Sequence, residues 1–453
     1  MSKMVDSTRG LVRRGVRLLV IFVLGIVLFV ASLTAVFALP QSRIITNLKA
    51  SLPVLRSEGK YPRLVMGKNN VYRLDNFDDA HWLDIAIVTE PGGPLVNAMA
   101  MYQGAVRNND TIELLAHDLA EPREAPGGYS YYWHGYQVFL RPALMAFNYG
   151  EIRYLNILLM GMLASVVALV AARKADALAA GTFVFALLLS GFWAVPLTIN
   201  LSSDAYLMLI GSLVVLLWAE KPSFRALAVE MFFVLGMLTS FFDNATNPLI
   251  TLGVPLGFAL IVFARNDPQG SEWRDVGFAA KAAVAWGVGY VASWVSKWLI
   301  GTAVLGYNVV QAGVSQLLFR TGAAEAKSQQ LSAVEWNLRN LFPLVRPDRF
   351  SAGLLLLLVV VGAILVLVIL CHRPAVEIRR RLAVLVVAPL PFIYYVVLSN
   401  LTLIHNWLSY HTLVITVFSV GYFSLAAIDF DKLSRRFTRV QALESDATAH
   451  AEG

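Results

Sequence analysis

The chain has 453 residues, of which 57% are hydrophobic and 15% are charged, and its mean hydropathy is +0.62. This composition excludes a soluble globular protein. The net charge of +7 does not indicate nucleic-acid binding, because the basic residues form short clusters beside apolar runs, as they do in membrane proteins.

The first apolar run, Leu18 to Leu39, contains no charged residue and is long enough to cross a bilayer. It is longer than the core of a signal peptide, and Pro40-Gln41-Ser42 is a poor cleavage site. We therefore predict a retained first span, preceded by a basic tail over residues 1–17.

A long outer segment, residues 40–153, follows the first span. Two short helices are predicted in it, Asn76 to Val88 and Leu95 to Arg107, separated by the breaker Pro91-Gly92-Gly93-Pro94. Apolar residues then recur at helical spacing over residues 136–147. That spacing predicts an amphipathic helix on the membrane surface.

Further apolar runs predict additional spans, about ten in all. They cover residues 154–172, 177–199, 205–219, 226–242, 244–264, 276–301, 351–371, 382–404 and 406–428. Spans two to seven thus occupy residues 154–301 and spans eight to ten residues 351–428. A second outer segment, 302–350, separates these groups, and a polar tail covers 429–453. We expect an all-α polytopic membrane protein with a large, partly helical outer loop.

Lysine and arginine set the direction of the spans, because cytoplasmic loops retain positive charge during insertion. If both termini lie inside, the short outer turns at residues 200–204, 243 and 405 carry neither residue. We therefore predict that both termini are cytoplasmic in a multi-pass plasma membrane protein, and we favour a bacterial membrane over an endoplasmic reticulum.

Asp78 and Asp79 open the predicted helix at residue 76, and Trp82, Ile85 and Ala86 follow on it. This pattern resembles the GT-C superfamily of membrane glycosyltransferases, which includes protein O-mannosyltransferases and lipid A aminoarabinose transferases. In those enzymes an acidic pair, a Tyr and an Ile-Ala commonly follow the first span.

The downstream motifs extend the resemblance over roughly residues 70–220. Aromatic residues surround His134, where the superfamily often carries His-Pro-Pro, and Gly150 and Arg153 follow the amphipathic helix in the family order. The polar run Asn200 to Asp204 occupies the turn expected after the third span. The chain departs from the pattern in having Gly-Tyr after His134 and no Arg in that turn.

The resemblance implies transfer of a sugar from a polyprenyl-phosphate donor to a cell-envelope glycan, lipid or protein acceptor at the outer face, by an inverting single displacement. Asp78 would be the base and Asp79 would orient the acceptor. Two adjacent carboxylates repel, which raises the pKa of one of them toward neutrality. The alternative is structural, because acidic residues favour the first turn of a helix.

Four basic residues are candidates for binding the donor phosphate or the substrate. Lys297, between two tryptophans near the outer end of the seventh span, could bind phosphate or anchor the interface. His134 could contact a sugar or phosphate, or belong to an aromatic belt. Arg141 and Arg153 could bind phosphate or anchor the amphipathic helix.

Asp204 and Asp243 are the remaining candidates. Asp204 lies at the beginning of the fourth predicted span, and Asp243 lies at the end of the fifth. Either could bind substrate or cap a helix. Asp243 could also pair with Lys297 across the bundle.

The sequence predicts no structural metal site. Cys371 is the only cysteine, so cysteine-based zinc sites are excluded, and His405 and His411 do not have the spacing of a metal pair on one helical face. Binding of a catalytic divalent cation remains an alternative, because His81 lies near Asp78 in the sequence.

Two other functions compete with glycosyl transfer. A transporter or flippase of lipid-linked or polar cargo could use Lys297, Asp243 and Asp204 as an intramembrane relay. Transporters commonly contain repeated halves, and the sequence shows no such internal symmetry. A non-catalytic assembly factor that uses its long loops to bind partners is the third possibility.

Overall fold

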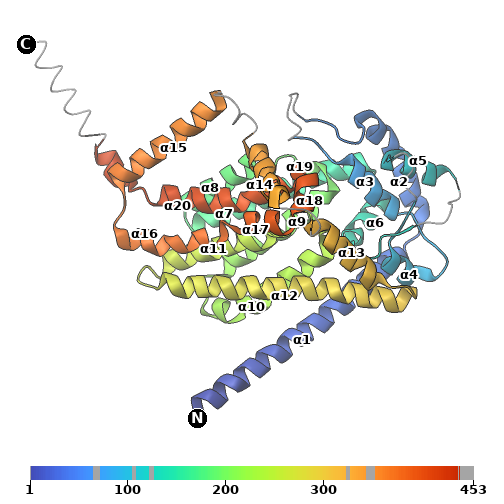
Figure 1. The fold of residues 1–453 in the computed structure, drawn as a ribbon, viewed down its shortest axis with the longest axis horizontal. Coiled ribbons are helices and arrows are strands. Elements are labelled where there is room, and N and C mark those ends of the chain that lie inside the picture. Colours follow the sequence, from blue (N-terminus) through green and yellow to red (C-terminus); the bar gives the residue numbers. More distant parts are fainter. Residues whose placement is uncertain are drawn as a thin grey trace, which may run out of the picture.

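The computed structural model describes residues 2–64, 72–104, 109–121, 127–322, 327–342 and 352–436, together with Thr438. Most of these residues are helical (Figure 1). Two short strands, β1 (Tyr102–Gln103) and β2 (Gly127–Gly128), form an antiparallel pair in the first outer segment.

The first half of the chain contains α1 (Ser2–Phe37), α2 (Gln41–Glu58), α3 (Asn76–Ile85), α4 (Gly93–Ala100), α5 (Thr111–Ala120), α6 (Gln137–Ala146), α7 (Tyr149–Lys174), α8 (Ala177–Leu189), η1 (Val195–Leu197), α9 (Ile199–Trp218) and α10 (Pro222–Phe242). The second half contains α11 (Ile250–Asn266), α12 (Glu272–Leu305), α13 (Val309–Thr321), α14 (Lys327–Leu341), α15 (Ala352–Cys371), α16 (Ala375–Arg381), η2 (Leu382–Val387), α17 (Leu390–Val397), α18 (Ser399–Ile404), α19 (Asn406–Ser409), η3 (Tyr410–Leu413) and α20 (Val414–Ala426).

Seven helical segments within the described ranges are long and apolar enough to cross a membrane. They are Val12–Phe37, Tyr149–Lys174, Ile199–Trp218, Pro222–Phe242, Glu272–Leu305, Ala375–Val397 and Asn406–Ala426. Three shorter apolar helices accompany them: Ala177–Leu189, Ile250–Asn266 and Leu358–Cys371. The chain is therefore an all-α protein of the polytopic membrane class.

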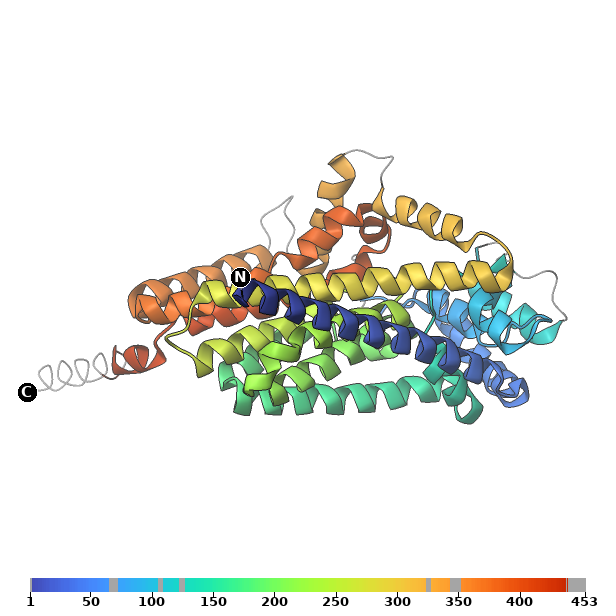
Figure 2. The ribbon, with the colours of Figure 1, turned by 90° about the horizontal axis from the view of Figure 1, so that it is seen from below.

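The long helices run in roughly the same direction (Figures 1 and 2). Helices α2 to α6 gather at one end of the bundle, whereas the start of α1 and the end of α20 lie toward the other end. Helices α10 and α12 pack against each other along their length. A Cβ at Gly236 would lie 2.0 Å from the carbonyl oxygen of Trp286, and one at Gly289 would lie 2.2 Å from that of Phe233. Both glycines therefore permit a close backbone approach.

Two helices of the first outer segment form where the sequence predicts them. Helix α3 begins at the predicted residue, Asn76, and α6 covers most of the predicted amphipathic helix. The prediction of a helix from Leu95 to Arg107 is wrong after Ala100. Met101 adopts a left-handed conformation with φ of 47°, which ends α4, and the next two residues form β1. Residues 105–107 of that prediction lie outside the described residues.

The boundaries of two predicted spans are also corrected. The span predicted for residues 177–199 ends at Leu189, and Gly191, with φ of 74°, turns the chain before η1. The polar run 200–204, predicted as a turn, forms the start of α9 instead. Farther on, the span predicted for 382–404 is divided into η2, α17 and α18.

A buried ion-pair cluster joins three helices at the end of the bundle where α1 begins. Asp275 of α12 is fully buried, accepts a hydrogen bond of 2.8 Å from Arg225 and pairs with Arg380, whose side chain is 4% exposed. Removing one partner of a buried pair leaves the other charge uncompensated.

We therefore expect Asp275→Ala to lower the free energy of unfolding by about 3–5 kcal/mol. Thermal unfolding in detergent, followed by circular dichroism, measures the change. The control is Asp267→Ala, which removes an exposed carboxylate paired with Arg274 and should change the unfolding temperature little. Equal shifts for the two variants would contradict the structural role of Asp275.

Candidate active-site cavity

A cavity of about 260 Å³ lies between the start of α3, the start of α9, the α10–α11 connection, the end of α13 and the broken helices α17 to α19. Its lining combines acidic, basic, amide and aromatic side chains. The lining residues are Phe77, Asp78, His81, Trp82, Tyr129, Asn200, Asn244, Thr246, Arg320, Tyr394, Leu401, His405, Leu408 and Ser409.

Asp78 lies in the first turn of α3, where Asp75 caps the helix by accepting a hydrogen bond from the Asp78 backbone N–H. The Asn200 side-chain Nδ2 donates to Oδ2 of Asp78 over 3.0 Å, and the Thr246 hydroxyl donates to Oδ1 of Asn200 over 3.0 Å. Because a carboxylate only accepts, the amide nitrogen must face Asp78. Thr246 and Asn200 therefore hold Asp78 in a fixed orientation at the cavity wall.

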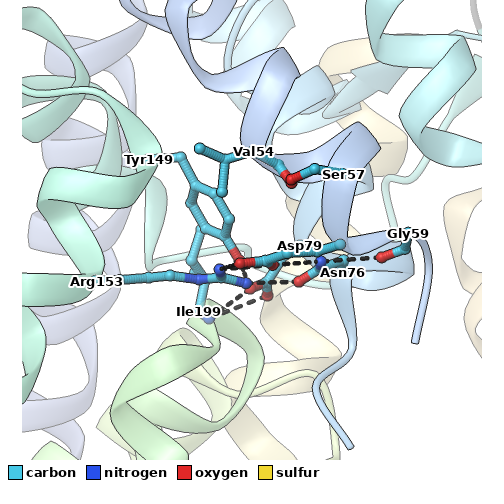
Figure 3. A network of polar contacts seen from close by, with 9 residues as sticks. Val54, Ser57, Gly59, Asn76, Asp79, Tyr149, Arg153 and Ile199 are labelled. Carbon is cyan, nitrogen blue, oxygen red and sulfur yellow. Dashed lines mark hydrogen bonds and ion pairs between the residues drawn. The ribbon is translucent and has the colours of Figure 1, made fainter. Parts of the chain in front are cut away.

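Asp79, beside Asp78 in the sequence, is fully buried and lies outside the cavity lining in a polar network (Figure 3). Its carboxylate accepts hydrogen bonds from the backbone N–H groups of Ile199 and Asn200, over 3.0 Å and 3.2 Å, and from the Tyr149 hydroxyl. It thereby occupies the positive N-terminal end of α9. Burial raises the pKa of Asp79 to about 6, against the opposing effect of the Tyr149 hydrogen bond.

Arg153 completes this network from α7. Its guanidinium donates to the Glu58 carboxylate over 2.8 Å and to the Asn76 side-chain oxygen over 2.6 Å. Asp79 and Arg153 thus connect α2, α3, α7 and α9 and place Asn200 against Asp78. Both residues therefore hold neighbouring helices of the site together.

We expect Asp79→Ala to lower the free energy of unfolding by about 3 kcal/mol or more, because it leaves buried donors at the start of α9 without an acceptor. Thermal unfolding in detergent measures the loss. Glu121→Gln, at an exposed position of the first outer segment, is the control. An unchanged unfolding temperature for Asp79→Ala would contradict the assigned role.

Arg320, near the end of α13, supplies a cation to the cavity. Its guanidinium carbon lies 5.3 Å from the ring centroid of Tyr132, and its buried Nε–H has no hydrogen-bond partner. Burial works against its charge, but the neighbouring tyrosines, Tyr132 and Tyr129 foremost, raise the pKa of Arg320 above its ordinary value. Nothing in the sequence indicates a role for Arg320, because it belongs to no motif and lies in the second outer segment.

Two histidines also face the cavity. His405 lies at the break between α18 and α19, packs against Trp407 with ring centroids 5.4 Å apart, and has a buried Nδ1 without a partner. Burial lowers the pKa of His405, although the charge of Asp78 opposes this effect. His81 contacts the side-chain oxygen of Gln103.

The cavity histidines do not belong to a cluster of conventional metal ligands. Among the described residues, no group of three or more His, Cys, Asp or Glu side chains could hold a metal ion. Asp84, a further acid of α3, accepts a hydrogen bond of 2.9 Å from the backbone N–H of Gly104.

Lys297 and His134 lie near each other but outside the cavity lining. The Lys297 ammonium donates to the carbonyl oxygens of Met99, over 2.8 Å, and of Ala98, over 3.4 Å, at the C-terminal end of α4. A cation is favourable at that end of a helix. In the described part of the chain Lys297 forms no ion pair with Asp243, so the expected pairing of these residues is absent from the structure.

His134 is fully buried and uses both ring nitrogens within the protein. Its Nδ1 lies 2.9 Å from the Tyr136 hydroxyl, and its Nε2 lies 3.1 Å from the Tyr129 carbonyl oxygen. Burial, with the charge of Lys297, lowers the pKa of His134 well below its ordinary value. A neutral ring that donates to the carbonyl and accepts from the hydroxyl fits both contacts.

Arg141 of α6 is fully buried and also lies outside the cavity lining. Its guanidinium donates to the carbonyl oxygen of Val36 over 2.8 Å and to that of Ala86. Arg141 therefore joins the end of α1 to the end of α3. Burial lowers its pKa to about 10.

Asp204 and Asp243, from α9 and the end of α10, contact each other through their carboxyl groups. Oδ2 of Asp204 accepts from the backbone N–H of Asn247 over 3.3 Å, and Oδ1 of Asp243 accepts from that of Thr246 over 2.7 Å. The pair is connected to the cavity through Asn244 and Thr246, which belong to its lining.

A separate apolar groove of about 600 Å³ runs between α7, α8 and α9. Trp193 lines it, and the Trp193 ring lies 5.2 Å from that of Tyr72. The next residue, Arg73, stacks on Trp407 with 3.5 Å between its guanidinium carbon and the ring centroid. Trp407 in turn packs on His405, which lines the cavity.

Comparison of the chain with protein-family models, with curated protein sequences and with solved structures yields no match. The functional assignment therefore rests on the geometry of the cavity.

Proposed function

We propose that the protein transfers a sugar from a polyprenyl-phosphate donor to an acceptor at the outer face of the membrane. The observation that carries this proposal is the presence of Asp78 and Arg320 in the lining of one cavity. A carboxylate can accept the proton of an acceptor hydroxyl, and a guanidinium can bind the phosphate that departs.

In the proposed reaction, the acceptor oxygen forms a bond to the anomeric carbon while the bond from that carbon to the phosphate oxygen breaks. The acceptor proton passes to Asp78, whose carboxylate is oriented by Asn200. The phosphate leaves with the bonding electron pair and carries a negative charge that Arg320 stabilises. Attack from the side opposite the phosphate inverts the configuration of the sugar.

The apolar groove beside α7 suits the tail of the donor. Its lining is almost entirely hydrophobic. The proposal places both termini in the cytoplasm and the cavity at the outer face of a bacterial plasma membrane. Acceptors would be glycans, lipids or proteins of the cell envelope.

The test uses the purified full-length protein in liposomes with a panel of radiolabelled polyprenyl-phosphate sugars and with glycan, lipid and peptide acceptors. We expect labelled product and an equal amount of released polyprenyl phosphate from at least one donor. If the protein binds polyprenyl phosphate equally well with and without Arg320, and no donor is consumed, the proposal is wrong.

A transporter or flippase is the second candidate, and the contact between Asp204 and Asp243 favours it, because paired acids inside a bundle are common in proton-coupled carriers. The two functions predict different results for one variant. Asp78→Asn should stop glycosyl transfer, whereas movement of a labelled lipid-linked sugar across the liposome membrane should continue if the protein is a flippase.

A further inference from the structure

Asp204 and Asp243 are both buried, with 0% and 2% of their surfaces exposed, and their carboxyl groups meet where the backbone N–H groups of two neighbouring loop residues, Asn247 and Thr246, donate to them. Two negative carboxylates repel strongly when they are removed from water. Such a contact is stable only when a positive species, a proton or a metal cation, lies between the carboxyl groups. The hydrogen bonds from Asn247 and Thr246 engage one oxygen of each residue and leave the other available.

Several buried oxygens around this contact have unmet hydrogen-bonding capacity. Oδ1 of Asp204 and Oδ2 of Asp243 have no hydrogen-bond partner. The same is true of Oδ1 of Asn244, which is 7% exposed, and of the Tyr132 hydroxyl, which is 1% exposed and interacts electrostatically with Asp243. Buried polar atoms normally have partners, so this group requires an explanation.

A proton shared between the carboxyl groups satisfies only the two carboxylate oxygens. A hard cation also engages the neutral oxygens, directly or through the water molecules that it keeps. The cavity gives access to water, because Asn244 belongs to its lining. The nearby Arg320 influences Asp243 electrostatically but forms no ion pair with it among the described residues.

We propose that Asp204 and Asp243 bind one divalent cation of the Mg²⁺ or Mn²⁺ class, with the side-chain oxygen of Asn244 as a further ligand. Two carboxylates, a neutral oxygen and several waters are a ligand set that Mg²⁺ accepts. Asp78 and the cavity histidines are not part of this site. The cation would lie next to the cavity, behind the lining residues Asn244 and Thr246. Binding of the cation does not depend on glycosyl transfer.

The test is titration of Mn²⁺ into the chelator-treated, full-length protein in detergent, with free Mn²⁺ followed by electron paramagnetic resonance. We expect one bound equivalent in the unmodified protein and loss of this binding in Asp204→Asn and in Asp243→Asn. Asp110→Asn, which changes an acid of the first outer segment, should bind as the unmodified protein does. Elution volume and circular dichroism establish that each variant is folded.

Asn244→Ala keeps both carboxylates and serves if either aspartate variant fails to fold; its Mn²⁺ affinity should fall roughly tenfold or more. Three results would overturn the proposal: no Mn²⁺ bound at millimolar concentration, binding retained in both aspartate variants, or an unchanged affinity in Asn244→Ala. In the first case, an infrared band of a protonated carboxyl that disappears in Asp204→Asn would identify a shared proton in place of the metal.

Discussion

Replacing Asp78 with Asn should lower the turnover number for sugar transfer by about 10²–10⁴-fold while the protein remains folded. Asparagine has the shape of aspartate but cannot take a proton from the acceptor hydroxyl. The side-chain oxygen of the new residue can still accept the hydrogen bond from Asn200, so the cavity wall is preserved. Donor binding should change little, because in the proposed reaction the carboxylate acts on the acceptor.

Initial rates with labelled donor in liposomes measure this effect, and binding of polyprenyl phosphate is measured in parallel. Glu121→Gln neutralises an exposed acid in the same outer segment and should leave both quantities unchanged. If the turnover number of Asp78→Asn is within a factor of about two of that of the unmodified protein, Asp78 is not the base. A general base contributes about 10²–10⁴-fold to the rate.

Arg320→Ala should lower kcat/KM for the donor by about 10–150-fold, which corresponds to the loss of one charge-assisted hydrogen bond of about 1.5–3 kcal/mol. The side chain has a free Nε–H and a charge that the surrounding tyrosines favour. Both properties are lost in alanine. Lysine restores the charge without the planar fork of donors, so Arg320→Lys should recover part of the activity.

The measurement pairs steady-state kinetics with direct binding of polyprenyl phosphate. Arg339→Ala is the matched control, because Arg339 lies in the same outer segment, pairs with Glu335 and is absent from the cavity lining. If Arg320→Ala binds polyprenyl phosphate as tightly as Arg339→Ala does, Arg320 does not contact the phosphate and the site must be reassigned.

The sequence predicts those features of the fold that depend on neighbouring residues. Apolar runs identify the helices of the bundle, and the spacing of apolar residues identifies α6. The start of α3 is predictable because Asp75 caps it from within the same turn. Helix signals of this kind act over a few residues and can be read locally.

Features that depend on distant residues could not be predicted. The start of α9 reads as a polar turn, although Thr198 caps it locally by accepting a hydrogen bond from the N–H of Leu201. The distant carboxylate of Asp79 adds a second cap, because it accepts from the N–H groups of Ile199 and Asn200. The cavity likewise combines Asp78, Asn200 and Arg320 from three separate regions of the chain. The environment of Lys297 was also not predictable. Its sequence position indicates only that it lies near an interface, whereas its ammonium group binds a carbonyl oxygen of α4, 198 residues away in the chain.

The contact between Asp79 and the start of α9 has a consequence for biosynthesis. The ribosome makes Asp79 long before it makes Ile199 and Asn200, so the acidic side chain emerges without the groups that later surround it. The carboxylate of Asp79 can complete its hydrogen bonds only after α9 has been synthesised and inserted. A truncated nascent chain that stops before α9 should therefore leave Asp79 accessible to water, and the cavity forms late in assembly.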